Sequence, residues 1–116
     1  DPRGIAVGTV SAWQDPDYLG EPWGQVHWLA VRPAYQRQGL ARAALAYTLR
    51  QLARWHTRAY LGTQSRRVGA IRLYLDMGFV PDLRHPGARR AWESVSREIE
   101  HPALAAALSL GGAARP

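Results

Sequence analysis

The chain has 116 residues, 47% of them hydrophobic and 21% charged, which is ordinary for one small globular domain with a modest core. It contains no cysteine, which excludes disulfide bonds and cysteine-based nucleophiles or metal ligands. No apolar run reaches the ~18 residues of a membrane-spanning helix and no signal-peptide pattern opens the sequence, so we expect a cytoplasmic protein without a membrane partner.

The formal net charge is +6, and all 15 basic residues are arginine. Two explanations are open: a coding bias toward arginine and alanine, or a basic surface for phosphates or nucleic acid. The arginines are spread from Arg3 to Arg115 rather than gathered in one patch. We therefore expect no nucleic-acid partner, and a nucleic-acid-binding domain is the weakest of the functional alternatives.

Strand signals dominate the first part of the chain. Residues 5–13 are β-branched and apolar, which predicts one strand or two short ones, with Gly8 as a bulge or kink. Residues 14–22 are dense in turn formers and predict a hairpin loop. A second strand follows over residues 24–31, and Pro33 ends it because proline cannot donate a ladder hydrogen bond.

The clearest helix runs from residue 38 or 39 to 56, with Leu45, Leu49 and Leu52 on one apolar stripe. Residues 59–63 then form a short apolar strand. A strand, a helix and a further strand make a crossover, so we expect this strand to lie parallel to residues 26–31.

Ser65 is the predicted N-cap of another helix, which has one apolar face and ends at Gly78. Further strands are predicted to begin at residue 79 and to span residues 91–99. Residues 101–116, rich in alanine, form either a frayed tail or a short appended helix.

The segment between the second strand and the long helix favours an anion. Gln36, Arg37, Gln38 and Gly39 lead directly into the helix, whose first backbone N–H groups are unpaired and carry partial positive charge. Glycine lets a ligand approach those groups closely, and Arg37 and Arg42 add formal charge beside them. The simplest ligand for this arrangement is a phosphate.

Two motifs carry a family resemblance. Gln36-Arg37-Gln38-Gly39-Leu40-Ala41 resembles the Gln/Arg-x-x-Gly-x-Gly/Ala signature of the GNAT acetyltransferase superfamily, and residues 70–79 resemble that family's second signature, in the expected order. The resemblance covers residues 8–83. It implies an α/β (α+β) fold with a mixed, mostly antiparallel sheet, a splayed parallel strand pair and flanking helices. We expect a single domain over residues 1–100 and a tail over residues 101–116.

The resemblance also implies acetyl-CoA as the acetyl donor and direct transfer to a primary amine of a small molecule or peptide. The pantetheine arm would lie along the second strand, and the diphosphate would lie on the loop and helix start. Arg67 stands where family members often have an asparagine that contacts the cofactor, and its guanidinium could reach a phosphate. The implied cofactor-binding residues are Leu29, Ala30, Val31, Gln36, Arg37, Gln38, Gly39, Leu40, Ala41, Arg42 and Arg67.

The resemblance implies one catalytic residue, and the residues themselves offer a second candidate. Tyr74 stands where the family often has the general acid that protonates the departing thiolate, although it also fits the apolar face of its helix. The glutamate base of many members is missing from the second strand, and His27 is the nearest substitute or else a structural histidine. Trp23, Trp28 and Tyr18 either line an acceptor pocket or fill the core. The remaining histidines lack metal-ligand spacing, so we expect no metal.

Members of this family normally place a strand and two helices before the matched region. Only 27 residues precede Trp28, too few for two helices of ~11–12 residues beside the strands. The chain is then either a fragment or a trimmed member, and its uncovered sheet leads us to expect that the isolated chain is either marginally stable or self-associates into a homo-oligomer. The functional alternative is a non-catalytic acyl-CoA-binding module.

Overall fold

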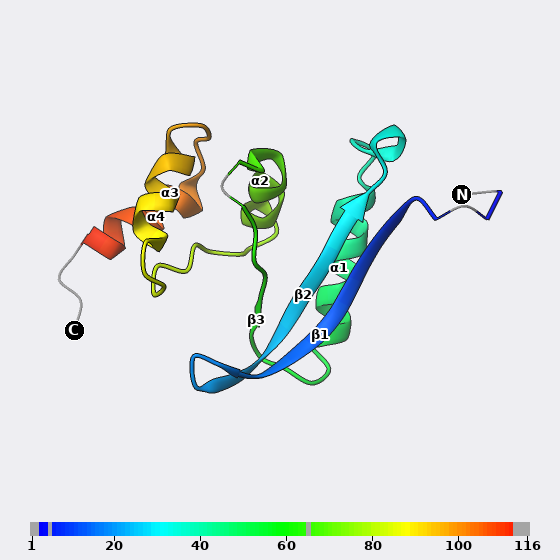
Figure 1. Cartoon of the computed structure of the whole chain (residues 1–116), viewed down its shortest axis with the longest axis horizontal. Coiled ribbons are helices and arrows are strands. Elements are labelled where there is room, and N and C mark those ends of the chain that lie inside the picture. Colours follow the sequence, from blue (N-terminus) through cyan, green and yellow to red (C-terminus); the bar gives the residue numbers. More distant parts are fainter. Residues whose placement is uncertain (1–2, 5, 65, 113–116) are drawn as a thin grey trace. The chain divides into compact units, whose positions relative to one another are not determined.

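The structure, a computed structural model, describes residues 3–4, 6–64 and 66–112. The chain divides into two compact units, residues 1–62 and 63–116. The first unit contains β1 (Gly8–Tyr18), β2 (Glu21–Val31), the 3-10 turn η1 (Pro33–Tyr35), α1 (Leu40–Leu52) and β3 (Ala59–Tyr60) (Figure 1). The second contains α2 (Val68–Asp76), α3 (Ala88–Ser96) and α4 (Pro102–Gly112). The expectation of one domain over residues 1–100 stays a prediction.

The strands form one mixed sheet in the order β1-β2-β3. β1 and β2 are antiparallel along almost their whole length, from the pair Gly8–Val31 to the pair Tyr18–Glu21. β2 and β3 are parallel but pair at two positions, Gly24–Ala59 and Gln25–Tyr60. This arrangement confirms the predicted fold class, a mixed and mostly antiparallel sheet with one parallel pair of strands. The parallel strands separate after two paired positions.

The hairpin differs from the prediction for residues 5–22. β1 continues to Tyr18 through the expected loop, and the chain turns instead at Leu19 and Gly20, whose φ angles are 53° and 92°. Two successive positive φ angles make the tight turn whose twist matches that of a two-stranded ribbon. Pro16 is tolerated because β1 is an edge strand and its pairing shifts between Asp15 and Tyr18.

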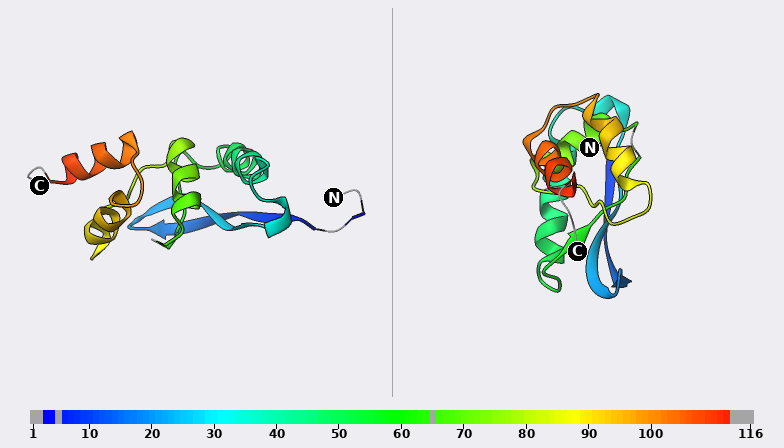
Figure 2. Two further views of the ribbon diagram at one scale, coloured as in Figure 1. Left: turned by 90° about the horizontal axis from the view of Figure 1, so that it is seen from above. Right: turned by 90° about the vertical axis from the view of Figure 1, so that its left-hand side faces the viewer.

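Helix α1 packs against one face of the β1–β2 ribbon (Figure 2). Its buried residues Leu45, Thr48 and Leu52 meet the buried Val26 side of the sheet. A Cβ at Gly24 would lie 3.1 Å from Leu52 Cδ2, so glycine permits this close approach. The predicted helix is confirmed, but it ends at Leu52 rather than at residue 56.

The second unit has an all-helical core. Gly78, at φ 102°, follows the end of α2 as predicted, whereas the predicted N-cap at residue 65 lies outside the described residues. The buried residues are Ile71 and Leu75 of α2, Val95 and Ile99 from α3 and the segment after it, and Leu104 of α4.

Both strands predicted in the second unit are wrong. Residues 79–81 form no strand, and most of residues 91–99 belong to α3. The apolar residues Trp92, Val95 and Ile99 are spaced by three and four, and this helical period outweighs the partial alternation. Of the two forms expected for the C-terminal residues, the structure shows the helix.

Polar contacts join the helices of this unit. His101 Nε2 lies 2.8 Å from Asp76 Oδ1, and His101 Nδ1 accepts a hydrogen bond from Ala103 N–H at 3.1 Å. Arg89 donates to the carbonyl of Leu108 at 2.8 Å. In the described part of the chain, no helix has the length and apolar character needed to cross a bilayer.

Candidate functional site

The loop between β2 and α1 contains two residues in the left-handed conformation. Arg37 has φ 64° and Gly39, the N-cap of α1, has φ 79°. Residues that alternate into this conformation turn their N–H groups toward a common side and form anion-binding concavities. A Cβ at Gly39 would meet no atom within 4 Å, so the glycine leaves open space at the helix start.

The start of α1 carries the partial positive charge of a helix N-terminus, and no acidic residue of the first turn offsets that charge. The first intrahelical hydrogen bond runs from Ala43 N–H to Gly39 O at 3.0 Å, so the N–H groups of Leu40 and Ala41 precede it. No side chain caps them, and the first turn contains no acidic residue. Arg37 and Arg42 are both exposed beside this helix end. The arrangement favours an anionic group at the N–H donors.

Gln36 fastens the loop to the end of β2. Its Nε2 donates a hydrogen bond to the carbonyl of Val31 at 2.8 Å. Arg32 holds the same strand end to the preceding segment, through N–H to Val7 O at 2.7 Å and Nε to Ala6 O at 2.6 Å. The structure thus brings together Gln36 and Val31, which the sequence predicted separately as cofactor contacts. Through this bond Gln36 positions the loop relative to the strand.

The predicted pantetheine-binding residues occupy the last part of β2. Ala30 and Val31 pair with Thr9 and Gly8 of β1 on one edge of the strand. On the other edge, pairing with β3 stops at Gln25, so within the described residues no strand pairs with that edge farther along. An extended ligand could therefore use this edge as an additional strand would.

His27 lies on the face of the sheet opposite α1. Side chains alternate along a strand, and Val26, its neighbour, belongs to the α1 face. The imidazole is partly buried, and its centroid lies 6.4 Å from that of Trp13. The side chain of Trp28 lies outside the described part of the structure.

The remaining predicted residues, Tyr74 and Arg67, belong to the second unit. Tyr74 of α2 is partly buried, and its ring meets Phe79 edge to face at 6.2 Å. Burial raises the pKa of Tyr74 above its ordinary 10.0, while the nearby Arg67 opposes part of the rise. The phenol is therefore protonated at neutral pH, as a proton donor must be. Arg67 is exposed at the N-cap of α2.

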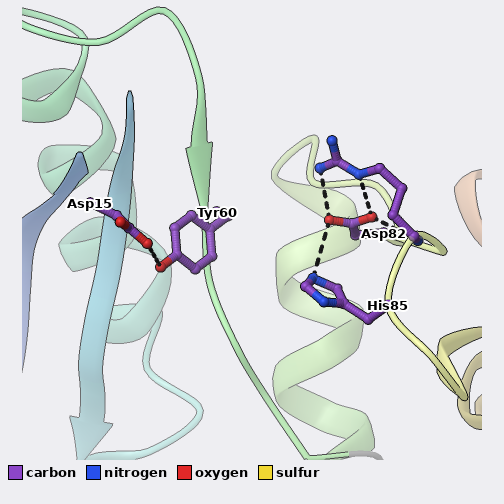
Figure 3. Close-up of polar contacts among 5 residues, drawn as sticks. Asp15, Tyr60, Asp82 and His85 are labelled. Atoms are coloured by element: carbon purple, nitrogen blue, oxygen red, sulfur yellow. Dashed lines mark hydrogen bonds and ion pairs between the residues drawn. The ribbon is translucent and has the colours of Figure 1, made fainter. Parts of the chain in front are cut away.

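One polar pair was missed from the sequence. The Tyr60 hydroxyl of β3 donates to Asp15 Oδ2 of β1 at 2.7 Å (Figure 3). Its neighbours Tyr18 and Trp23 were anticipated as core or pocket residues, and their rings lie 3.8 Å and 6.3 Å from that of Tyr60. The pair was missed because residues 14–22 were interpreted as a loop. Alternation of side chains through a continuous strand was the signal that would have found it.

Other polar clusters have a local role. Arg84 donates to both carboxylate oxygens of Asp82 at 2.8 Å, and His85 lies 3.7 Å from Asp82 Oδ2 (Figure 3). These residues lie within one short loop and stabilise its turn. Throughout the described residues, no three histidine, aspartate or glutamate side chains gather as metal ligands would.

Comparison with known proteins identifies the family. The Acetyltransferase (GNAT) family model matches residues 2–79, which is more than half of the chain. The chain therefore belongs to this family, and the resemblance seen in the two motifs is confirmed. No curated protein is significantly similar to the chain.

Solved structures support the same fold. A GCN5-related N-acetyltransferase from Ralstonia eutropha JMP134 is 23% identical with a TM-score of 0.55, over 73% of this chain and 58% of that one. A transcriptional regulator from Bacillus halodurans C-125 is 21% identical with a TM-score of 0.55, over 68% and 53%. An aminoglycoside acetyltransferase from an uncultured soil metagenomic sample is 28% identical with a TM-score of 0.56, over 71% and 57%. The match thus spans a little over half the length of each of these proteins.

Proposed function

We propose that the chain binds acetyl-CoA and transfers its acetyl group directly to a primary amine, as an N-acetyltransferase. Membership of the acetyltransferase family supports the general activity. The observation that carries the assignment to acetyl-CoA is the uncapped start of α1, which follows two left-handed residues and has no acidic residue in its first turn.

The residues of the loop fit a diphosphate. The N–H groups of Leu40 and Ala41 supply donors at the positive end of α1, and Arg37 and Arg42 supply charge. The open space at Gly39 admits a phosphate to the backbone. A negatively charged ligand would thus complete a helix end that the described side chains leave without a cap.

The strand edge fits the arm of the cofactor. The amides of pantetheine would bond to backbone groups of Leu29, Ala30 and Val31. These residues lie along the edge of β2 that is no longer paired with β3 after Gln25. Gln36 keeps the loop at a fixed position relative to this edge through its bond to Val31. Binding of the diphosphate and of the arm would therefore be coupled.

The bound acetyl-CoA would supply a thioester whose carbonyl carbon an amine can attack. His27 is the proposed base that takes the proton from the amine, and a backbone N–H near Leu29 is the proposed donor to the carbonyl oxygen. Tyr74 is the proposed acid that protonates the CoA thiolate as the carbon–sulfur bond breaks. A tyrosine with its ordinary pKa of 10.0 already carries this proton at neutral pH, and burial, which raises the pKa of Tyr74 further, does not remove it.

The acceptor is a primary amine of a small molecule or a peptide. One structural neighbour is an aminoglycoside acetyltransferase, which makes aminoglycosides one class worth testing here. A non-catalytic acyl-CoA-binding module is the alternative, because cofactor binding and acceptor binding depend on different residues.

The test is acetyl-CoA-dependent acetylation of an amine panel that contains alkylamines, polyamines, an aminoglycoside and a lysine peptide. We expect release of CoA together with an acetylated amine, detected by mass spectrometry. Binding of CoA without acetylation of any amine would favour the binding module. Absence of both binding and transfer would contradict the proposal.

A further inference from the structure

The Asp15–Tyr60 pair joins the two outer strands of the sheet across β2. Asp15 pairs with Trp23 of β2, and Tyr60 pairs with Gln25, so their side chains share the face opposite α1. Tyr60 donates to Asp15 Oδ2 at 2.7 Å, and Asp17 N–H donates to Asp15 Oδ1 at 3.0 Å. A carboxylate accepts about four hydrogen bonds, so Asp15 retains roughly two acceptor positions for a ligand.

Asp15 is also the acidic group near the closed end of the hairpin that a side chain of another strand holds in place, through Tyr60. Between residues 2 and 75 the acidic residues are Asp15, Asp17 and Glu21. Glu21 forms an ion pair with Arg58, and Asp17 Oδ1 accepts the Gly20 N–H of the turn at 2.9 Å. The described ion pairs of this unit include no arginine partner for Asp15.

The surroundings of Asp15 favour its anionic form. The hydrogen bond from Tyr60, and then that from the Asp17 backbone, lower the pKa of Asp15 below its ordinary 3.8. A carboxylate with a lowered pKa is a poor general base near neutral pH, but it remains a permanent negative charge. Tyr60, whose pKa is raised to about 12, remains a neutral hydrogen-bond donor.

Aromatic rings lie next to Tyr60, the hydrogen-bond donor to this carboxylate. Tyr18 and Tyr60 stack at 3.8 Å with an interplanar angle of 13°, and Trp23 packs edge to face against Tyr18 at 5.1 Å. Ring faces attract cations and pack against alkyl chains. The Arg58 guanidinium already lies over the Trp23 ring, 5.6 Å from its centroid. The stacked Tyr18 and Tyr60 rings would therefore pack against the alkyl chain of a ligand whose ammonium group meets the carboxylate.

The distance from the proposed base is consistent with a two-ended acceptor. His27 lies two residues along β2 from Gln25, the partner of Tyr60, and four residues from Trp23, the partner of Asp15. At a strand rise of about 3.3 Å per residue, the ammonium and the reacting amine would lie roughly 7–13 Å apart.

We propose that Asp15, held in place by Tyr60, binds a non-reacting ammonium group of the acceptor, so that the preferred acceptor is a diamine or polyamine. This inference rests on the proposed acetyl transfer. The attacking amine must be neutral, whereas a permanent carboxylate keeps its bound partner protonated. The two amino groups of one acceptor would therefore have different roles, one held at Asp15 and the other near His27.

The test compares hexamethylenediamine with hexylamine, which has the same carbon chain and lacks the second amino group. We expect the parent protein to prefer the diamine by tenfold or more in kcat/KM, since hydrogen bonds to charged groups are among the strong ones. Asp15→Asn, which can still accept the Tyr60 hydrogen bond, should raise the KM for the diamine about tenfold and leave hexylamine unchanged. Tyr60→Phe should have the same effect to a smaller extent.

Asp17→Asn is the matched control, because it removes the same charge two residues away. We expect it to keep the preference for the diamine. If both variants lost the preference for the diamine equally, the preference would come from the net charge of the region and not from a contact with Asp15. That result would overturn the role of Asp15. Equal kcat/KM of the parent for the two amines would also overturn it, while leaving acetyl transfer itself established.

A binding measurement separates this inference from the proposed function. Calorimetry of hexamethylenediamine with the parent, Asp15→Asn and Asp17→Asn proteins does not require turnover. Loss of binding in Asp15→Asn alone supports the site even if no amine is acetylated. The same affinity in all three proteins would contradict it, whatever the outcome with acetyl-CoA.

Discussion

Arg37 and Leu19 are the two residues other than glycine with positive φ in the described part of the chain, at 64° and 53°. The tight hairpin turn explains Leu19, because both residues of such a turn need positive φ. Arg37 follows the extended Gln36 (φ −72°, ψ 161°) in a turn of type II character, whose second central residue needs positive φ; for a residue other than glycine this costs on the order of 1–2 kcal/mol. Strain of this kind persists where the surrounding structure requires it, and here it lies beside the anion-binding helix start.

A variant of Tyr74 distinguishes an enzyme from a non-catalytic binding module. Tyr74→Phe keeps the ring that contacts Phe79 and removes the proton donor. If Tyr74 is the general acid, single-turnover acetyl transfer should slow by ~10²–10⁴-fold while acetyl-CoA affinity changes little. Because burial raises the pKa of Tyr74 above 10.0, its acid form, and the rate that depends on it, should be lost only as the pH rises past that value. Equal rates in both proteins would remove Tyr74 from the mechanism.

At the level of single elements, the best predictions were those with a strong chemical signal. Pro33 marks the end of β2, Gly39 the start of α1 and Gly78 the end of α2, and the structure places all three as expected. Each has a backbone property that few other residues share: a missing N–H or free access to positive φ.

The parts that could not be predicted depend on tertiary context. The sequence Asp15-Pro16-Asp17 has the composition of a turn, yet it lies in an edge strand because its pairing with β2 outweighs local preference. The turn itself contains Leu19, which gives no turn signal. Likewise, the hydrogen bond between Gln36 and Val31 depends on the exact return of the loop to the strand end, which spacing alone does not specify.

Helix α4 is expected to be part of the core of the second unit rather than an appendage. Leu104 is 1% exposed, in contact with the cluster of Ile71 and Val95. Leu104→Ala should lower the free energy of unfolding of this unit by about 2–5 kcal/mol. Amide hydrogen exchange of α2 and α3 measures this change locally.

The matched control for this variant is Val80→Ala, which truncates a side chain that is 71% exposed in the same unit. It should change the free energy of unfolding by less than about 0.5 kcal/mol. If Leu104→Ala were equally mild, α4 would contribute little to the core.

Over the first unit as a whole, charge is separated along the β1–β2 ribbon. The acidic residues Asp15, Asp17 and Glu21 lie at its closed end, whereas Arg32, Arg37 and Arg42 lie at or after its other end. Strands of 11 residues are ~35 Å long. Glu21 is paired with Arg58 at the closed end, so attraction of a cation there depends on Asp15 and Asp17, whereas an anionic donor would be drawn to the other end.

The central claim, that the loop before α1 binds the diphosphate of acetyl-CoA, is tested most directly by calorimetry of CoA with Gly39→Val and Gly20→Val proteins. Both glycines have positive φ, 79° and 92°, and a Cβ at either would meet no atom within 4 Å, so the two changes strain the backbone alike. We expect Gly39→Val to weaken CoA binding at least tenfold, because valine would occupy the space of the phosphate, and Gly20→Val to bind CoA like the parent. Unchanged affinity in a folded Gly39→Val protein would contradict the account.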